Sequence, residues 1–90
     1  MRVLNEKILV KVTVEEETTK SGIIMSAAGH ERKYEGTVEE VGTNPDIAAM
    51  GIKKGDYVFY PKGLNTEFSV DGTLYDIVSI YDILAVGEED

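Results

Sequence analysis

The sequence predicts an all-β fold, a small antiparallel barrel or sandwich, on three observations. Short runs rich in β-branched and aromatic residues follow one another along the chain. Signals made of Gly, Pro, Asn and Asp separate these runs, and no stretch has a long helical period. Closure or stacking of the sheet would protect the edges that so small a sheet exposes.

The first two strands are predicted from period-two patterns. In residues 7–14, Ile8, Val10, Val12 and Val14 alternate with other residues, which predicts a strand with one buried face. Residues 36–42 form a second, shorter strand. Within it Val38 and Val41 differ in parity, so a bulge or bend is expected between them.

The second half of the chain is predicted to contain four further strands, six in all. The run at residues 57–60 lies between a turn at 53–56 and the stop at 61–63. Residues 66–70 and 73–79 flank Asp71-Gly72, a dipeptide that tolerates positive φ and predicts a tight type I′ hairpin. Residues 83–86 form a last short strand, followed by the charged tail 88–90.

Two segments do not fit this strand pattern. Residues 15–33 are rich in Glu, Thr, Ser, Lys and Gly, so a long mobile loop is predicted there. Its one apolar island, Ile23-Ile24-Met25, is expected to be covered by another molecule, although a short buried strand fits the pattern equally well. The second segment, residues 43–52, is predicted to contain one helical turn.

Composition and motifs exclude several classes of function. The 90 residues suffice for one domain, and 17 acidic against 9 basic residues give a net charge of −8, which disfavours nucleic acid and anionic membranes as partners. No cysteine is present, and a solvated loop position is expected for the single histidine, His30, so neither disulfides nor a metal site is predicted. Nucleotide-binding glycine motifs and nucleophile elbows are absent, so no enzyme is predicted. Since no signal peptide or membrane span is evident, a soluble cytoplasmic protein is expected.

At five positions in order along nearly the whole chain, the sequence resembles the GroES co-chaperonin family. Residues 4–11 resemble the family's L-x-D-R-V-L-V-K, and residues 20–25 resemble its T-x-G-G-I-V-L. The remaining matches are to E-G-x-V-x-x-V-G at residues 35–42, V-K-x-G-D-x-V-L-F at 52–60 and S-D-I-L-A-V at 81–86.

The resemblance implies a non-enzymatic lid that caps an ATP-driven GroEL-type chaperonin and encloses unfolded client proteins. The partner chaperonin, not this chain, would bind the ATP. Chaperonin binding would fall to Gly22, Ile23, Ile24 and Met25 in the mobile loop. No cofactor is implied for the chain itself, and the setting would be the cytoplasm of a bacterial cell or of a phage-infected host.

The resemblance also implies a seven-membered ring, in which the C-terminal strand of one subunit pairs with the N-terminal strand of the next. The subunit interface would contain Arg2, Val3, Leu4, Ile83, Leu84, Ala85 and Val86. Pairing across subunits would remove two sheet edges at once, although pairing of the two ends within one subunit fits the pattern as well.

Three departures from the family pattern limit the resemblance. Val3 replaces a usual proline, and Ser21 replaces a common loop glycine. Residues 43–53 are shorter than the segment that usually forms a roof hairpin, which predicts a dome open at the top.

Two other functions fit a small barrel. One is a stand-alone ligand-binding module, which a monomer with a small-molecule pocket would support. The other is a fragment of the kind found in alcohol dehydrogenases, but the chain lacks cysteine ligands for zinc and the length for a dinucleotide-binding domain.

Overall fold

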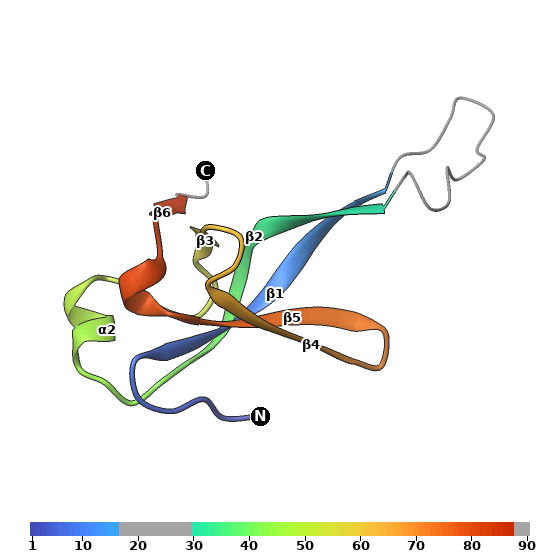
Figure 1. Cartoon of the computed structure of the whole chain (residues 1–90). Coiled ribbons are helices and arrows are strands. Elements are labelled where there is room, and N and C mark those ends of the chain that lie inside the picture. Colours follow the sequence, from blue (N-terminus) through green and yellow to red (C-terminus); the bar gives the residue numbers. More distant parts are fainter. Residues whose placement is uncertain (17–29, 88–90) are drawn as a thin grey trace.

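The fold is one antiparallel β-sheet with very little helix, described by a computed structural model over residues 1–16 and 30–87. Its strands are β1 (Lys7–Glu16), β2 (His30–Val41), β3 (Tyr57–Phe59), β4 (Asn65–Val70), β5 (Thr73–Ser79) and β6 (Ala85–Gly87). The helical elements are α2 (Asp46–Ala49) and a 3₁₀ turn, η1 (Ile80–Asp82) (Figure 1). The predicted all-β class is confirmed.

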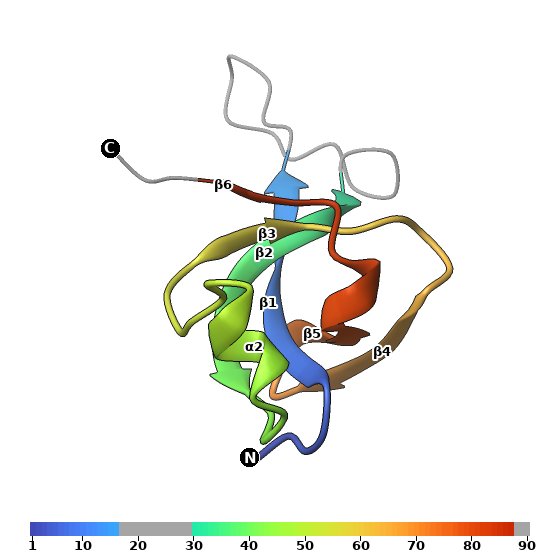
Figure 2. The same cartoon turned by 90° about the vertical axis from the view of Figure 1, so that its left-hand side faces the viewer.

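The sheet has the strand order β4-β5-β1-β2-β3-β6. It curls, with β3 and β6 on one side and β4 and β5 on the other (Figure 2). Among the described residues β4 and β6 do not pair with each other, so they are the two edges of the sheet. The predicted barrel is therefore a curled sheet that is open between β4 and β6.

The core lies on the concave side of this sheet and follows the predicted period of two in β1. Ile8 and Val10 are fully buried and Val12 nearly so, whereas Val14 is 43% exposed and its predicted place in the core is wrong. Leu9, on the opposite face, is also buried. The core cluster draws on most elements: Ile8, Val10, Val38, Ile47, Ile52, Val58, Tyr60, Val78 and Ile80.

The second strand is longer than predicted. It begins at His30, and its first residues pair with Val14, Glu15 and Glu16 of β1, so residues 15, 16 and 30–33 belong to strands and not to a loop. The charged composition of this stretch predicts no strand, but the strongly β-forming β1 supplies a partner for its backbone.

The predicted bulge in β2 is confirmed. Leu9 pairs with Glu40 while Val10 pairs with Val38, which leaves Glu39 as the extra residue. A second shift follows between Val12, which pairs with Gly36, and Val14, which pairs with Arg32. Only glycine fits at Gly36, because a Cβ there would lie 2.1 Å from the carbonyl oxygen of Lys11.

The β4–β5 hairpin has the predicted turn, since Asp71 and Gly72 both have positive φ, 48° and 82°. The last strand differs from prediction, because it comprises Ala85–Gly87 and not residues 83–86. The N–H of Ile83 still donates to Ile80 of the 3₁₀ turn, and contact with β3 begins where the N–H of Leu84 donates to the carbonyl oxygen of Phe59.

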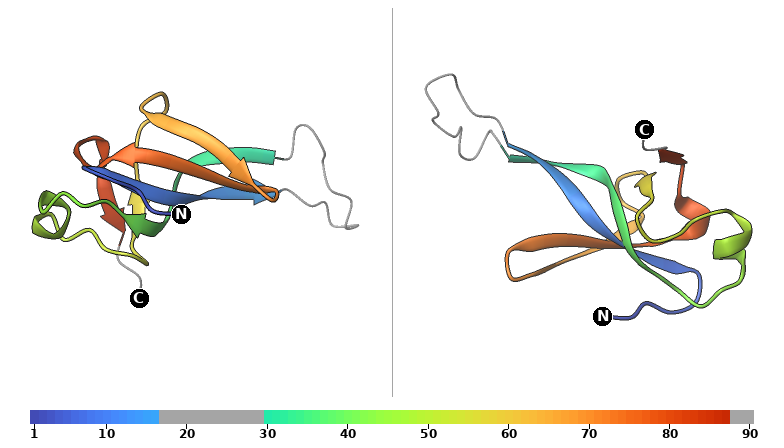
Figure 3. Two further views of the ribbon diagram at one scale, coloured as in Figure 1. Left: turned by 90° about the horizontal axis from the view of Figure 1, so that it is seen from below. Right: turned by 180° about the vertical axis from the view of Figure 1, so that it is seen from behind.

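The connection from β2 to β3 contains the predicted helical turn, α2. Ile47 and Ile52 anchor it to the core, and Gly51 ends it with a φ of 80°. Every residue of 43–53 is described, and none is in a strand, so this segment does not form a hairpin. It projects at the end of the molecule that also carries η1 (Figure 3).

Candidate functional site

The outer edge of β6 is the candidate site. β6 pairs with β3 along one side, with Val58 opposite Val86 and Phe59 opposite Ala85. Its other side has no partner strand in the described ranges. A row of unpaired backbone N–H and C=O groups is a template for another strand.

The side chains around this edge are apolar and exposed. Leu84 is 71% exposed and Val86 is 40% exposed, and Ala85 between them is exposed as well. Ile83 differs, because it packs against the core of its own chain. Of the four predicted C-terminal interface residues, three therefore face outward and one is a structural residue.

The predicted N-terminal interface residues divide in the same way. Val3 is buried, whereas Arg2 is exposed and Leu4 is 52% exposed. None of them is in a strand, and the N-terminus lies on the opposite side of the molecule from β6 (Figure 1). The alternative in which the two ends pair within one subunit is thus not what the chain adopts.

An apolar hollow of about 300 Å³ lies beside β6, between α2 and η1. Met50 and Tyr81, which are 49% and 56% exposed, line this hollow. The Tyr81 hydroxyl donates a hydrogen bond to Asp46 of α2 over 2.7 Å. Its lining comprises Met50, Ile52, Ile80, Tyr81, Ile83, Leu84, Ala85 and Val86. Sequence reasoning did not join Met50 and Tyr81 to β6, because only the folded chain brings residues 43–53 next to the C-terminal strand.

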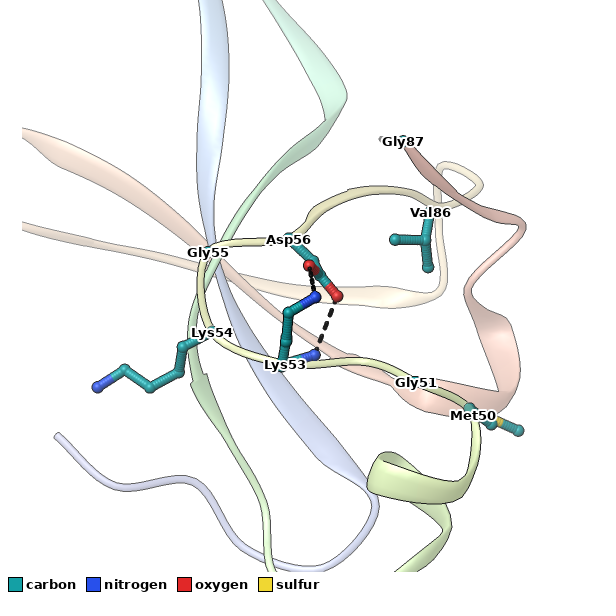
Figure 4. A pocket seen from close by; sticks show the side chains of 8 residues that line it. All are labelled: Met50, Gly51, Lys53, Lys54, Gly55, Asp56, Val86 and Gly87. Carbon is teal, nitrogen blue, oxygen red and sulfur yellow. Dashed lines mark hydrogen bonds and ion pairs between the residues drawn. The ribbon is translucent and has the colours of Figure 1, made fainter. Parts of the chain in front are cut away.

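A larger pocket of about 660 Å³ lies between β6 and residues 50–56 (Figure 4). Three of its eight lining residues are charged, and each of them is paired. Lys53 donates to Asp56 over 2.8 Å, and Lys54 donates to Glu40, outside the pocket, over 3.2 Å. The hydrogen bond from Lys53 lowers the pKa of Asp56. Small-molecule sites are lined mainly by apolar and aromatic groups, so this pocket does not favour the ligand-binding module.

A buried polar cluster lies under β2, β4 and β5. Asp76, fully buried on β5, accepts hydrogen bonds from Tyr60 (2.5 Å), from Asn65 (2.9 Å) and from both terminal nitrogens of Arg32. Arg32 also pairs with the half-exposed Glu67, and its guanidinium lies 3.9 Å from the ring centre of Tyr34.

The carboxylate at the centre of this cluster is charged. Burial raises the pKa of Asp76, but the hydrogen bonds from Arg32, Tyr60 and Asn65 outweigh it, so the net pKa is lowered. Burial likewise acts against the charge of Arg32, yet its bonds to Asp76 and Glu67 raise its pKa. Sequence reasoning missed the cluster, although the period of two in β5 puts Asp76 on the same face as the core residue Val78.

The remaining predictions meet the structure only in part. Gly22, Ile23, Ile24 and Met25 lie outside the described residues. His30, predicted to lie in a loop, is instead the first residue of β2. Within residues 1–16 and 30–87 no group of three His, Cys, Asp or Glu residues is arranged to hold a metal ion. No described helix has the length and hydrophobicity to cross a membrane.

Comparisons with known proteins agree with one another. The family model described as Chaperonin 10 Kd subunit matches residues 1–87. A protein named co-chaperonin GroES from Clostridium beijerinckii is 40% identical over 89 residues, which cover 94% of this chain and 95% of that protein. Proteins of the same name from Coprothermobacter proteolyticus and Methanosarcina acetivorans are 41% and 37% identical, over 92% and 100% of this chain and 90% and 83% of their own lengths.

Proposed function

Since the chain belongs to the Chaperonin 10 Kd subunit family, we propose that it is a co-chaperonin that assembles into a heptameric ring and caps a GroEL-type chaperonin. The ring is a lid that closes a chamber over unfolded client protein. The partner binds and hydrolyses ATP, while this chain works in the cytoplasm without a cofactor and without catalysis.

The observation that carries the assembly is the unpaired, apolar edge of β6. Leu84 and Val86 expose side chains that gain free energy when another subunit covers them, about 1.5–3 kcal/mol for each fully buried residue. The N-terminal residues Arg2 and Leu4 lie outside any strand and away from β6, so they are available to the neighbouring subunit. Closed rotational symmetry then repeats one contact around the ring.

Binding to the chaperonin is proposed to use Ile23, Ile24 and Met25, with Gly22 allowing the bend before them. Three apolar side chains contribute about 2 kcal/mol each, and fixing the backbone opposes them by roughly 1–2 kcal/mol per residue, so a single contact is weak. Several identical contacts on one ring act together through avidity. A modest change in the partner on ATP turnover is then enough to release the lid.

The test is the substitution Ile24→Asp, with Ser26→Asp as a control that adds the same charge to a neighbouring polar position. We expect the Ile24 variant to lose binding to a purified GroEL-type chaperonin in the presence of ADP, because its charge would have to enter an apolar groove. The melting temperature should stay unchanged in both variants, and the control should bind.

Two results would reject this account of binding. A lowered melting temperature of the Ile24→Asp protein would place the apolar triplet in the fold of the chain, as the short-strand alternative requires. Undiminished binding would place the contact elsewhere. A stable monomer in native mass measurements would reject the ring and favour the ligand-binding module.

A further inference from the structure

Residues 14–16 of β1 and 30–32 of β2 form an extension of the sheet that we call the arm. In the described chain these residues pair only with each other, through Val14 with Arg32, Glu15 with Glu31 and Glu16 with His30. β5 pairs with β1 only as far as Lys11, and β3 pairs with β2 only at 35–37. The arm and the β4–β5 hairpin therefore diverge, as Figure 1 shows.

Arg32 bridges this divergence. It lies at the inner end of the arm, and its side chain, 17% exposed, reaches Asp76 on β5 and Glu67 on β4. Tyr60 and Asn65 also donate to the carboxylate of Asp76, so its position is fixed by other parts of the chain as well as by the arginine. The planar guanidinium contacts both carboxylate oxygens, which fixes its direction as well as its position.

Stability alone does not explain a buried ion pair at this place. Well-packed apolar residues of similar volume often stabilise a fold as much or more, because the charges must be taken out of water. A fully satisfied buried pair does, however, admit few alternative geometries. The arm is the one part of β1 and β2 whose direction the neighbouring strands leave open.

We propose that Arg32 and Asp76 are positioning residues that fix the direction of the arm, and with it the place at which residues 17–29 are presented to the chaperonin. This role rests on the proposed function of that segment. Multivalent binding depends on whether all copies can engage at once, so the direction shared by the arms affects the affinity of the whole ring.

The test uses a double variant, Arg32→Met with Asp76→Asn. It removes the ion pair without leaving a lone buried charge, keeps the net charge, and retains an oxygen that can accept from Tyr60. Glu67→Gln is the matched control, because it removes the half-exposed partner of the same arginine. Arg32→Lys keeps the charge but not the two-pronged contact, and it carries the test if the double variant does not fold.

Two measurements separate positioning from general stability. The chain has no cysteine, so spin labels can be placed through Val14→Cys on the arm and Ser69→Cys on β4, in subunits diluted into unlabelled rings. The distance distribution between these labels reports the direction of the arm. Affinity of the ring for a purified GroEL-type chaperonin with ADP reports its consequence, and thermal unfolding monitors the fold.

We expect the double variant to broaden the distribution of label distances and to lower the affinity for the chaperonin about tenfold. The affinity of Arg32→Lys should lie between those of the double variant and the unsubstituted ring. The affinity of Glu67→Gln should lie within twofold of that of the unsubstituted ring. An unchanged distance distribution would overturn the inference, and so would broadened distances with unchanged affinity. Failure of the unsubstituted ring to bind any chaperonin would instead overturn the proposed function, and the distances would still show whether the ion pair directs the arm.

Discussion

The two edges of the sheet, β4 and β6, differ in almost every respect. β4 pairs with β5 along its whole length, and it carries the polar residues Thr66, Glu67 and Ser69 exposed on its surface. β6 is only three residues long, and Leu84 and Val86 expose apolar side chains there. A charged residue on an edge strand discourages pairing with another chain, whereas an unpaired edge with exposed apolar side chains favours it. The contrast indicates that the β4 edge is protected against pairing with another chain, whereas the β6 edge is suited to it.

The largest expected effect comes from one substitution made at both edges. Val86 and Val70 are 40% and 43% exposed, so they are matched in type and in exposure. If the proposed ring buries β6 between subunits, Val86→Lys should break it into smaller species at micromolar concentration, because each contact would lose a buried valine, about 1.5–3 kcal/mol, and would have to cover a charge. Val70→Lys should leave the ring intact. Sedimentation velocity distinguishes the two outcomes.

Equal effects of the two substitutions would contradict the proposal that β6, and not β4, lies at the subunit interface. A Val86→Lys ring as stable as the unsubstituted one would show that β6 is not at the interface. Dissociation caused by Val70→Lys would instead identify β4 as a contact surface.

Local patterns predicted the features that depend on one stretch of chain. The dipeptide Asp71-Gly72 predicted the hairpin turn, and the parity of Val38 and Val41 predicted the bulge in β2. The extension of β2 to His30 was not predictable in this way, because its strand state depends on pairing with β1. Long-range partners set such states, and propensity within one segment does not report them.

The sequence predicted which apolar residues belong to the candidate site. It did not predict which of their side chains face solvent or which distant residues lie beside them. The sequence indicated residues 83–86 together, yet Ile83 faces the core and Leu84 faces solvent. The hollow that Met50 and Tyr81 form with β6 exists only after the chain has folded. Asp76 was detectable as a polar residue at an inward position, but its partner Arg32 is far away in sequence and on another strand.

The second prediction concerns the hydrogen bond from Asn65 of β4 to the buried Asp76 of β5, which attaches the β4 edge to the interior of the fold. The folded-state pKa of Asp76 lies below its ordinary value of about 3.9, although burial raises it, because Arg32, Tyr60 and Asn65 donate hydrogen bonds to the carboxylate. The other charged group that faces this cluster, Glu67, is paired with Arg32. A depressed carboxyl pKa contributes stability that is present above the unfolded value and is lost as pH falls through the folded value. Below about pH 4 the stability of the chain should therefore decline.

The measurement is urea unfolding between pH 7 and pH 2, compared with Asp76→Asn. The variant should lose about 1.5–3 kcal/mol at pH 7, the usual contribution of a hydrogen bond to a charged group, and the difference from the unsubstituted chain should shrink as the pH falls. Parallel pH profiles would mean that Asp76 does not carry the charge that holds β4.

The smallest effect is expected at the turn that joins β4 to β5. Gly72 has a φ of 82°, and a Cβ at this position would have no atom within 4 Å beyond its two chain neighbours, so Gly72→Ala meets backbone strain and no clash. An alanine in this left-handed region should cost about 1 kcal/mol, whereas Asp71→Asn should cost almost nothing, because asparagine tolerates positive φ. Since β5 is the one strand that pairs with β4 in residues 1–16 and 30–87, the loss should appear as faster amide exchange in β4 and not in β6. Assembly should be unaffected. Slower sedimentation of the Gly72→Ala protein would contradict the conclusion that β4 takes no part in subunit contacts.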